Sequence, residues 1–318
     1  MRIAVVGKGW SGKTTICGLL AFYLQTISQP FLVIDADINM HLPSLLLGKA
    51  FPEEKYLSRS QNTTAIKTFL KGSNDRIQDL DSFRKTTPPA EWSNLFVLMD
   101  QEHPFYQRYA EEISWWHLMV VGTYEKEGIA SSCYHNNLAI FENLLSHSLE
   151  GERIILADMV AGTDAFASSL HMQFDLLLFV VEPTKKSLEV WTQYAELAKT
   201  AGVYDSLFAV GNKCLDSEEE HFLRENIDAD KLLGVLGFSK YLRHLEQEGG
   251  TISFSQLEPQ YQSDFSSFLQ KAKQLEKTPL ERLHQLWKVH KTYVSQKFIV
   301  QRCGDLTGQI DPHFRFYF

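Results

Sequence analysis

One short segment does most to limit how this chain can fold: residues 7–15, which read G-K-G-W-S-G-K-T-T. The segment matches G-x-x-x-x-G-K-[ST], a phosphate-binding loop whose expected context is a preceding strand and a following helix. Residues 3–6 form a short apolar run typical of a buried strand, and apolar residues then recur at helical spacing from Ile16 to Ile27. This context favours a nucleotide phosphate site over an ordinary glycine-rich turn.

The residue types in the loop suit a bound polyphosphate. Glycines let successive backbone N–H groups turn toward one anion, and the following helix adds the positive end of its dipole. Lys13 is expected to reach the β- and γ-phosphates, and the Thr14 hydroxyl to ligate Mg²⁺. We expect the nucleotide to contact the whole loop: Gly7, Lys8, Gly9, Trp10, Ser11, Gly12, Lys13, Thr14 and Thr15.

The rest of the first 248 residues alternates strand and helix patterns. Such alternation predicts an α/β fold, a mostly parallel P-loop NTPase sheet flanked by helices, with right-handed crossovers. Residues 50–115 are less regular and are interpreted as an insertion of short helices and loops. Further strands are expected at residues 31–34, 116–122, 153–157, 175–181, 207–210 and 232–236, and helices at 136–149, 185–200 and 217–226.

Strand signals disappear after about residue 248, so residues 249–318 are predicted to be a C-terminal helical extension of the domain that residues 1–248 form. Within it, residues 279–300 carry apolar side chains near helical spacing with Lys, Arg and His between them. Such a helix can pack its apolar stripe on the parent domain or lie on a membrane surface. We favour packing and keep peripheral membrane contact as the alternative.

Composition excludes some classes of protein. A net charge of −8 gives no global basic field for holding nucleic acid. The four cysteines form no C-x-x-C pair, so neither a disulfide framework nor an intrachain zinc knuckle is indicated. No apolar run reaches the roughly 18–20 residues that span a bilayer, and the first residues read as a buried strand rather than a cleavable leader. We expect a cytoplasmic protein.

Polar residues follow three of the predicted strands. Asp35 and Asp37 follow the second strand, Asp158 ends the strand at 153–157, and Asn212 follows the strand at 207–210. Two carboxylates at the end of a strand beside a phosphate loop suit Mg²⁺ coordination through water and orientation of an attacking water. A solvated turn after the second strand and a strand-end turn at Asn212 are the alternatives, since Asp and Asn favour turns.

These motifs resemble those of the SIMIBI-class, deviant Walker A ATPases, which include the MinD and ParA proteins and the nitrogenase iron protein. The resemblance covers roughly residues 1–245 and is greatest to CooC-type ATPases, which help insert nickel into carbon monoxide dehydrogenase. It implies an ATP-dependent homodimer. It also implies that Lys8 is the signature lysine, which crosses the dimer interface to the partner's nucleotide as an arginine finger does.

The same resemblance assigns roles to the residues at the strand ends. Asp37 would position the attacking water, and Asp35 would hold Mg²⁺ through water. Asp158 would serve the outer shell of the metal, and the Gly162 N–H would sense the γ-phosphate. Asn212 would contact adenine. ATP is preferred over GTP because a guanine reader would show N-K-x-D, and here Asp216 comes one residue too late.

The sequence also departs from the CooC pattern. Val160 stands where those proteins usually have Glu, and Thr163, Asp164 and Ser169 replace a following Glu-His pair and Arg. Trp10 replaces a small loop residue, so its side chain is expected to point away from the phosphates.

The sequence also lacks one cysteine of a pair that CooC-type proteins carry. Residues 131–133 read S-S-C where CooC-type proteins carry C-x-C at the dimer interface. Two copies of Cys133 with two of His135 would make a Cys2His2 metal set across a two-fold axis, although a buried or idle cysteine is the favoured interpretation.

The function expected from the sequence is an ATP-binding and hydrolysing dimer switch that acts on a client protein, with metalloenzyme maturation as one such role. The alternatives are a positioning or partition ATPase of the MinD or ParA type, and a nucleotide-bound scaffold with little hydrolysis.

Overall fold

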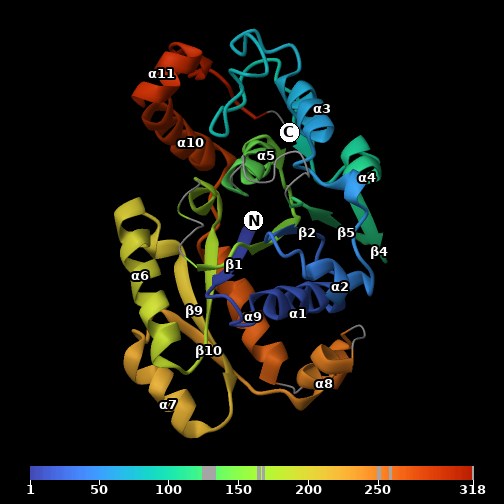
Figure 1. The fold of residues 1–318 in the computed structure, drawn as a ribbon, viewed down its shortest axis with the longest axis vertical. Coiled ribbons are helices and arrows are strands. Elements are labelled where there is room, and N and C mark those ends of the chain that lie inside the picture. Colours follow the sequence, from blue (N-terminus) through green and yellow to red (C-terminus); the bar gives the residue numbers. More distant parts are fainter. Residues whose placement is uncertain (124–133, 163–165, 167–168, 249–251, 258–259, 317–318) are drawn as a thin grey trace.

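A single large sheet organises the molecule (Figure 1). The structure, a computed structural model, describes residues 1–123, 134–162, 166, 169–248, 252–257 and 260–316. The sheet has eight strands in the order β10-β9-β8-β1-β7-β2-β5-β4, and every neighbouring pair is parallel except β4 with β5. Its strands are β1 (Arg2–Gly7), β2 (Phe31–Ala36), β4 (Ala110–Ile113), β5 (Trp116–Val120), β7 (Ile154–Met159), β8 (Leu176–Val181), β9 (Leu207–Cys214) and β10 (Leu232–Gly237). Two short strands, β3 (Phe96–Val97) and β6 (Ser148–Leu149), pair separately.

Helices cover both faces of the sheet, because the central strands are buried on both sides and need apolar cover there. One core packs the sheet against α1, α2 and α9, and the other packs it against α3, α5 and α6. The helices are α1 (Lys13–Thr26), α2 (Leu42–Leu47), α3 (Ser60–Lys71), α4 (Pro104–Tyr109), α5 (Tyr134–Ser146), α6 (Lys185–Ala201), α7 (Ser217–Asn226), α8 (Lys240–Glu248), α9 (Gln260–Gln274), α10 (Pro279–Val294) and α11 (Lys297–Cys303). The predicted α/β class with a mostly parallel, helix-flanked sheet and helices at the C-terminal end is confirmed.

Two local predictions are corrected. The single helix expected at residues 279–300 is wrong, because α10 ends at Val294 and the extended backbone at Gln296 separates it from α11. The turn lets Val294 and Ile299 pack together with Leu306 in a small cluster of their own. The strand expected at 207–210 is longer, since β9 continues to Cys214.

The end of the chain returns to the insertion at residues 50–115, so that α10 and α11 lie beside it at one end of the molecule (Figure 1). The Thr87 hydroxyl donates to Gln309 Oε1 at 2.9 Å, and Arg76 pairs with Asp311 at 3.7 Å. Helix α9, by contrast, packs in the same core as α1. Division of the chain at residue 248 stays a prediction. In the described part of the chain, no helix has the length and apolar character to cross a membrane.

Candidate functional site

The phosphate loop joins the end of β1 to the start of α1, as its motif requires. Gly7 has φ of 150°, and a Cβ there would lie 2.7 Å from the Val180 backbone oxygen on the neighbouring strand β8. Gly12, at the N-terminus of α1, has φ of 95°, and a Cβ there would overlap the side-chain amide of Asn212. Both positions need glycine for conformation and for space.

Two side chains from β9 donate hydrogen bonds to backbone oxygens of the loop. The Asn212 amide nitrogen donates to the Ser11 backbone oxygen at 2.8 Å, and Lys213 Nζ donates to the Trp10 backbone oxygen at 2.7 Å. Asn212 is only 7% exposed, so this contact lies inside the protein. The adenine contact expected of Asn212 stays a prediction, and the role visible in its hydrogen bonds is support of the loop.

Asp35 on β2, Asp37 just after β2 and Asp158 on β7 gather beside the loop. These two strands are neighbours and place Asp35 directly opposite Asp158 in their register. The Thr14 hydroxyl donates to Asp158 Oδ2 at 2.6 Å, while the buried Oδ1 of the same carboxylate has no hydrogen-bond partner among the residues that the structure describes. Asp35 accepts from the backbone N–H groups of Asp37 and Leu42 at 3.0 and 3.2 Å. The sequence predicts only that each of these side chains follows a strand, and the structure brings them together in one cluster because β2 and β7 are neighbours.

The environment of this cluster disfavours negative charge. Burial raises the pKa of Asp158 to about 7, an effect that the nearby Lys13 ammonium and the Thr14 hydrogen bond partly oppose. Burial and then the charge of Asp158 raise the pKa of Asp35 well above its ordinary range. Carboxylates held in this way gain stability when a cation arrives.

Lys13, the first residue of α1, is buried beside Asp37. Its Nζ lies 3.8 Å from Asp37 Oδ2, and the two side chains are 5% and 8% exposed. The other oxygen of Asp37 accepts from the backbone N–H and the side-chain amide of Asn39, each at 2.9 Å. The lysine expected at the phosphates is therefore paired in this structure with the aspartate expected to orient water.

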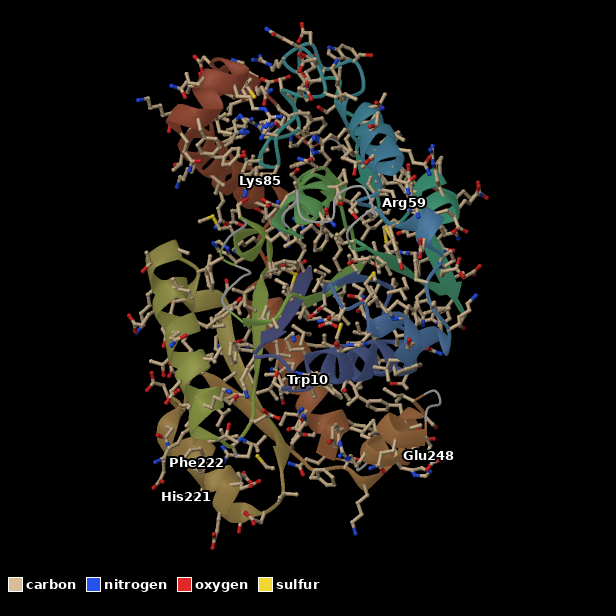
Figure 2. The ribbon with its side chains drawn as sticks, in the orientation of Figure 1. Trp10, Arg59, Lys85, His221, Phe222 and Glu248 are labelled. Carbon is tan, nitrogen blue, oxygen red and sulfur yellow. The ribbon has the colours of Figure 1, made fainter. Side chains whose placement is uncertain are left out.

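Two further loop residues, Lys8 and Trp10, differ in exposure, since Lys8 is partly buried and Trp10 is exposed. Lys8 Nζ lies 3.8 Å from Glu182 Oε2, just beyond the end of β8. Trp10 is 90% exposed with φ of 70°, and it lies beside the start of α1 (Figure 2). The prediction that Trp10 points away from the phosphate side fits this exposure. Gly162 has φ of 71°, and no atom of the described residues beyond its chain neighbours lies within 4 Å of where a Cβ would stand.

Sequence reasoning missed Glu182 and Lys213, which both lie beside the loop. Glu182 lies 3.1 Å from Lys213, so one carboxylate serves both Lys8 and Lys213. Glu182 directly follows a predicted strand and Lys213 directly follows Asn212, and these positions were the available signal.

Cys133, Thr163 and Asp164 lie outside the described residues, as does the side chain of His135, so the proposed two-fold metal set also falls there.

The oxygen groups in the cluster fit Mg²⁺. Hydroxyl and carboxylate oxygens are the ligands this ion prefers, and it usually keeps several waters and binds substrate phosphates. Among the described residues, no three His, Cys, Asp or Glu side chains converge as a ready metal cage. A magnesium ion here would therefore be held by Thr14, Asp35 and Asp158 together with water and phosphate oxygens. Asp158 Oδ1, which has no hydrogen-bond partner among the described residues, is a buried oxygen whose charge such an ion would compensate.

Comparison with known proteins agrees with this architecture. The sequence is 28% identical over 251 residues to the carbon monoxide dehydrogenase accessory protein CooC of Rhodospirillum rubrum, a match covering 78% of this chain and 88% of that protein. It is also 28% identical over 242 residues to an uncharacterised ATP-binding protein of Methanocaldococcus jannaschii, covering 76% of this chain and 85% of that one. No protein-family model matches the sequence.

Solved structures show the same fold at low identity. A putative plasmid partition protein of Borrelia burgdorferi B31, bound to AMPPNP, superposes with a TM-score of 0.53 at 14% identity, covering 85% of this chain and 97% of that one. The septum site-determining protein MinD of Pyrococcus horikoshii OT3, complexed with Mg-ADP, gives 0.50 at 19% identity, with 87% and 95% covered. The chain therefore has the MinD/ParA-like P-loop ATPase fold and is related in sequence to CooC.

Proposed function

We propose that this protein binds and hydrolyses ATP with Mg²⁺, and that ATP closes two copies of it into a dimer that a client protein reads. The observation that carries the proposal is the Lys13–Asp37 pair across the phosphate loop. A bound γ-phosphate would draw Lys13 away from Asp37 and release that carboxylate. Nucleotide binding and assembly of the hydrolytic site would then be one event.

Each residue of the site has a defined task in this proposal. The loop N–H groups and Lys13 bind the phosphates, and Thr14, Asp35 and Asp158 hold the metal's ligand sphere. When bound, Mg²⁺ would neutralise charge on the phosphate oxygens. Asp37, freed from Lys13, orients the water that attacks the γ-phosphorus. The bond from that phosphorus to the ADP oxygen breaks, and the water's proton leaves through Asp37 to solvent.

Lys8 supplies the dimer dependence. A cation that enters the partner's site stabilises the charge of phosphoryl transfer only while two copies are together. Hydrolysis removes the γ-phosphate, and with it part of the reason for the copies to stay together. A client that prefers one of the two states is then switched by nucleotide.

The class of client follows only from sequence relatedness. CooC of R. rubrum is named as an accessory protein of carbon monoxide dehydrogenase, so maturation of a metalloenzyme is the client role we propose first. The fold is shared with a plasmid partition protein, which supports partition or positioning as the second candidate. The net charge of −8 weighs against a DNA surface.

The proposal is tested by calorimetric titration of ATP, ADP and GTP with Mg²⁺, followed by a phosphate-release assay. We expect ATP to bind and turn over. We also expect K13A to weaken ATP binding by about 10- to 100-fold, the value of one or two charge-assisted hydrogen bonds. K49A is the matched control, because Lys49 is an exposed surface lysine. A wild-type protein that binds neither ATP nor ADP would refute the proposal, and ATP binding without phosphate release would leave only the scaffold alternative.

A further inference from the structure

The Glu182 carboxylate is shared by two lysines at the edge of the phosphate loop. Its Oε2 lies 3.8 Å from Lys8 Nζ, and its Oε1 lies 3.1 Å from Lys213 Nζ. Lys213 Nζ also donates to the Trp10 backbone oxygen at 2.7 Å. One carboxylate thereby connects to the loop twice, through the Lys8 side chain and, by way of Lys213, through the Trp10 backbone.

The topology of the sheet brings these groups together. Strand β8 lies between β1 and β9, and its register pairs Val180 with Gly7 and Val181 with Gly211. Because the three strands are parallel, the residues that follow their carboxyl ends meet at one edge. The Glu182 backbone is fixed there by its N–H, which donates to the hydroxyl of the buried Ser187 at 3.0 Å.

Partial burial strengthens these contacts. The side chains of Lys8 and Glu182 are 26% and 19% exposed, so solvent screens their attraction less than it would on an open surface. Lys213 adopts φ of 61°, a backbone conformation unusual for a lysine, and both of its described polar contacts are to this assembly. A strained backbone held by two contacts indicates a specific placement of the Lys213 ammonium.

We propose that Glu182 is a positioning residue that holds Lys8 on its own subunit until nucleotide and a second copy of the chain compete for it. This inference rests on the proposed function, because it concerns when Lys8 becomes available to the partner. In the nucleotide-free protein, Glu182 neutralises Lys8 and holds it against its own subunit. On closure, Lys8 exchanges this carboxylate for the partner's phosphates, while Lys213 keeps both Glu182 and the loop in place.

The first test needs no nucleotide. Brief acetylation with acetic anhydride, read by peptide mass spectrometry, measures how available the Lys8 amine is. In E182Q, which keeps the size of the side chain but removes its charge, Lys8 should acetylate about two- to threefold faster than in wild type, in line with the loss of a weak ion pair. E182D should return the rate toward wild type. E189Q is the matched control, because Glu189 is an exposed glutamate on α6 with the same charge.

The second test measures the ATP-dependent dimer. Releasing two Lys8–Glu182 pairs costs free energy at closure, so E182Q should lower the dimer dissociation constant with a slowly hydrolysed ATP analogue. About threefold per protomer, or roughly tenfold for the dimer, is the expected size. Because K8A is expected to form no ATP-dependent dimer, E182Q should not restore one in that background. A merely structural role for Glu182 would not make the effect of E182Q depend on Lys8.

The outcomes separate this inference from the proposed function. Unchanged Lys8 acetylation in E182Q overturns the inference, whatever the dimer does. Faster acetylation in a protein that binds no nucleotide supports the contact between Glu182 and Lys8 and refutes the proposed function. Faster acetylation with an ATP dimer that E182Q does not strengthen, or an ATP dimer that E182Q produces in the K8A background, overturns the proposed competition for Lys8.

Discussion

The Asn212 amide nitrogen lies 2.8 Å from the Ser11 backbone oxygen, inside the protein and directly behind the phosphate loop. A residue at this place fixes the position of the loop before any nucleotide arrives. The bond also explains why position 12 is glycine, since a Cβ there would overlap the same amide. Shape and contact at the loop are therefore set partly by β9, about 200 residues away in sequence.

The first prediction concerns this bond. N212A leaves the buried Ser11 carbonyl without its donor and should lower the free energy of unfolding of the nucleotide-free protein by about 1–2 kcal/mol. N226A is the matched control, because the Asn226 amide makes an equally short bond to the Phe222 carbonyl, but on the exposed surface of α7. Urea unfolding measures both. Equal losses in the two variants would show that the loop does not depend on Asn212.

The second prediction concerns Asp158, whose pKa burial raises to about 7. A carboxyl with a raised pKa stabilises the fold below its unfolded value near 4, and this contribution is lost as pH rises toward 7. The D158N side chain is an amide that does not ionise, so the variant does not lose stability in this way. The nucleotide-free variant should therefore be more stable than wild type at pH 8, by up to about 4 kcal/mol, and similar to it at pH 4.

Urea unfolding across this pH range, with D75N as an exposed control, tests the second prediction. A D158N difference that stays constant with pH would contradict it. A stability difference between D158N and wild type that grows as pH falls would also contradict it.

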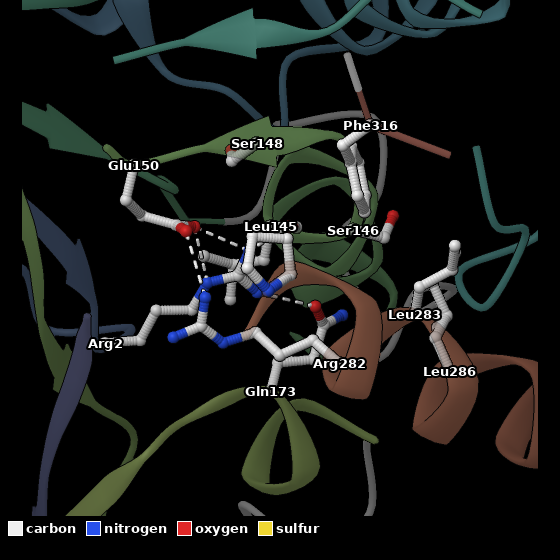
Figure 3. A pocket seen from close by; sticks show the side chains of 11 residues that line it. Arg2, Leu145, Ser146, Ser148, Glu150, Gln173, Arg282, Leu283, Leu286 and Phe316 are labelled. Atoms are coloured by element: carbon white, nitrogen blue, oxygen red, sulfur yellow. Dashed lines mark hydrogen bonds and ion pairs between the residues drawn. The ribbon is translucent and has the colours of Figure 1, made fainter. Parts of the chain in front are cut away.

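The third prediction concerns the opposite end of β1, where a buried charge cluster holds α10 (Figure 3). Arg282 pairs with Glu150 at 3.0 Å and with Asp175 at 2.6 Å, and Arg2 pairs with Glu150 at 2.6 Å. R282M leaves these carboxylates short of positive charge in a buried place and should cost about 3–5 kcal/mol of stability. R302M, at an exposed arginine on α11, should cost little. Similar unfolding midpoints for the two variants would contradict this account of the cluster.

The fourth prediction concerns acid. His290 on α10 is buried between the Thr86 hydroxyl at 3.0 Å and the Leu306 carbonyl at 3.2 Å, and burial lowers its pKa to about 4. The unfolded chain takes up a proton here at higher pH than the folded chain does. Stability is therefore fully present above about pH 6.5 and is lost as pH falls toward 4, by about 3 kcal/mol at most.

The advantage of wild type over H290Q should accordingly shrink between pH 7 and pH 4. His147 titrates in the same direction in both proteins, so it cancels from the comparison. An advantage independent of pH would contradict the assignment to His290.

The parts of this molecule that could be predicted are those encoded locally. The loop motif and the apolar runs predict the strands and a mostly parallel sheet, while the roles of Asp35 and Asp158 at a metal beside the loop came from the resemblance to deviant Walker A ATPases. Which side chain touches which beside the loop depends on register between strands, and so the contacts of Asn212 and Glu182 were not foreseen.

Contacts between residues far apart in the sequence also could not be predicted. Arg2, Glu150, Asp175 and Arg282 are far apart in sequence and no spacing rule joins them. The break between α10 and α11 carries no proline or glycine, and it forms because the residues around Val294 and Ile299 pack on each other. Both features are set by tertiary structure rather than by local pattern.

The central claim is that ATP closes two copies through Lys8, and assembly state measured by light scattering tests it most directly. Wild type and K8A are compared with ADP and with a slowly hydrolysed ATP analogue, each with Mg²⁺. The account predicts a dimer for wild type with the ATP analogue only, and a monomer for K8A with either nucleotide. A wild-type chain that stays monomeric, or dimerises regardless of nucleotide and of Lys8, would contradict it.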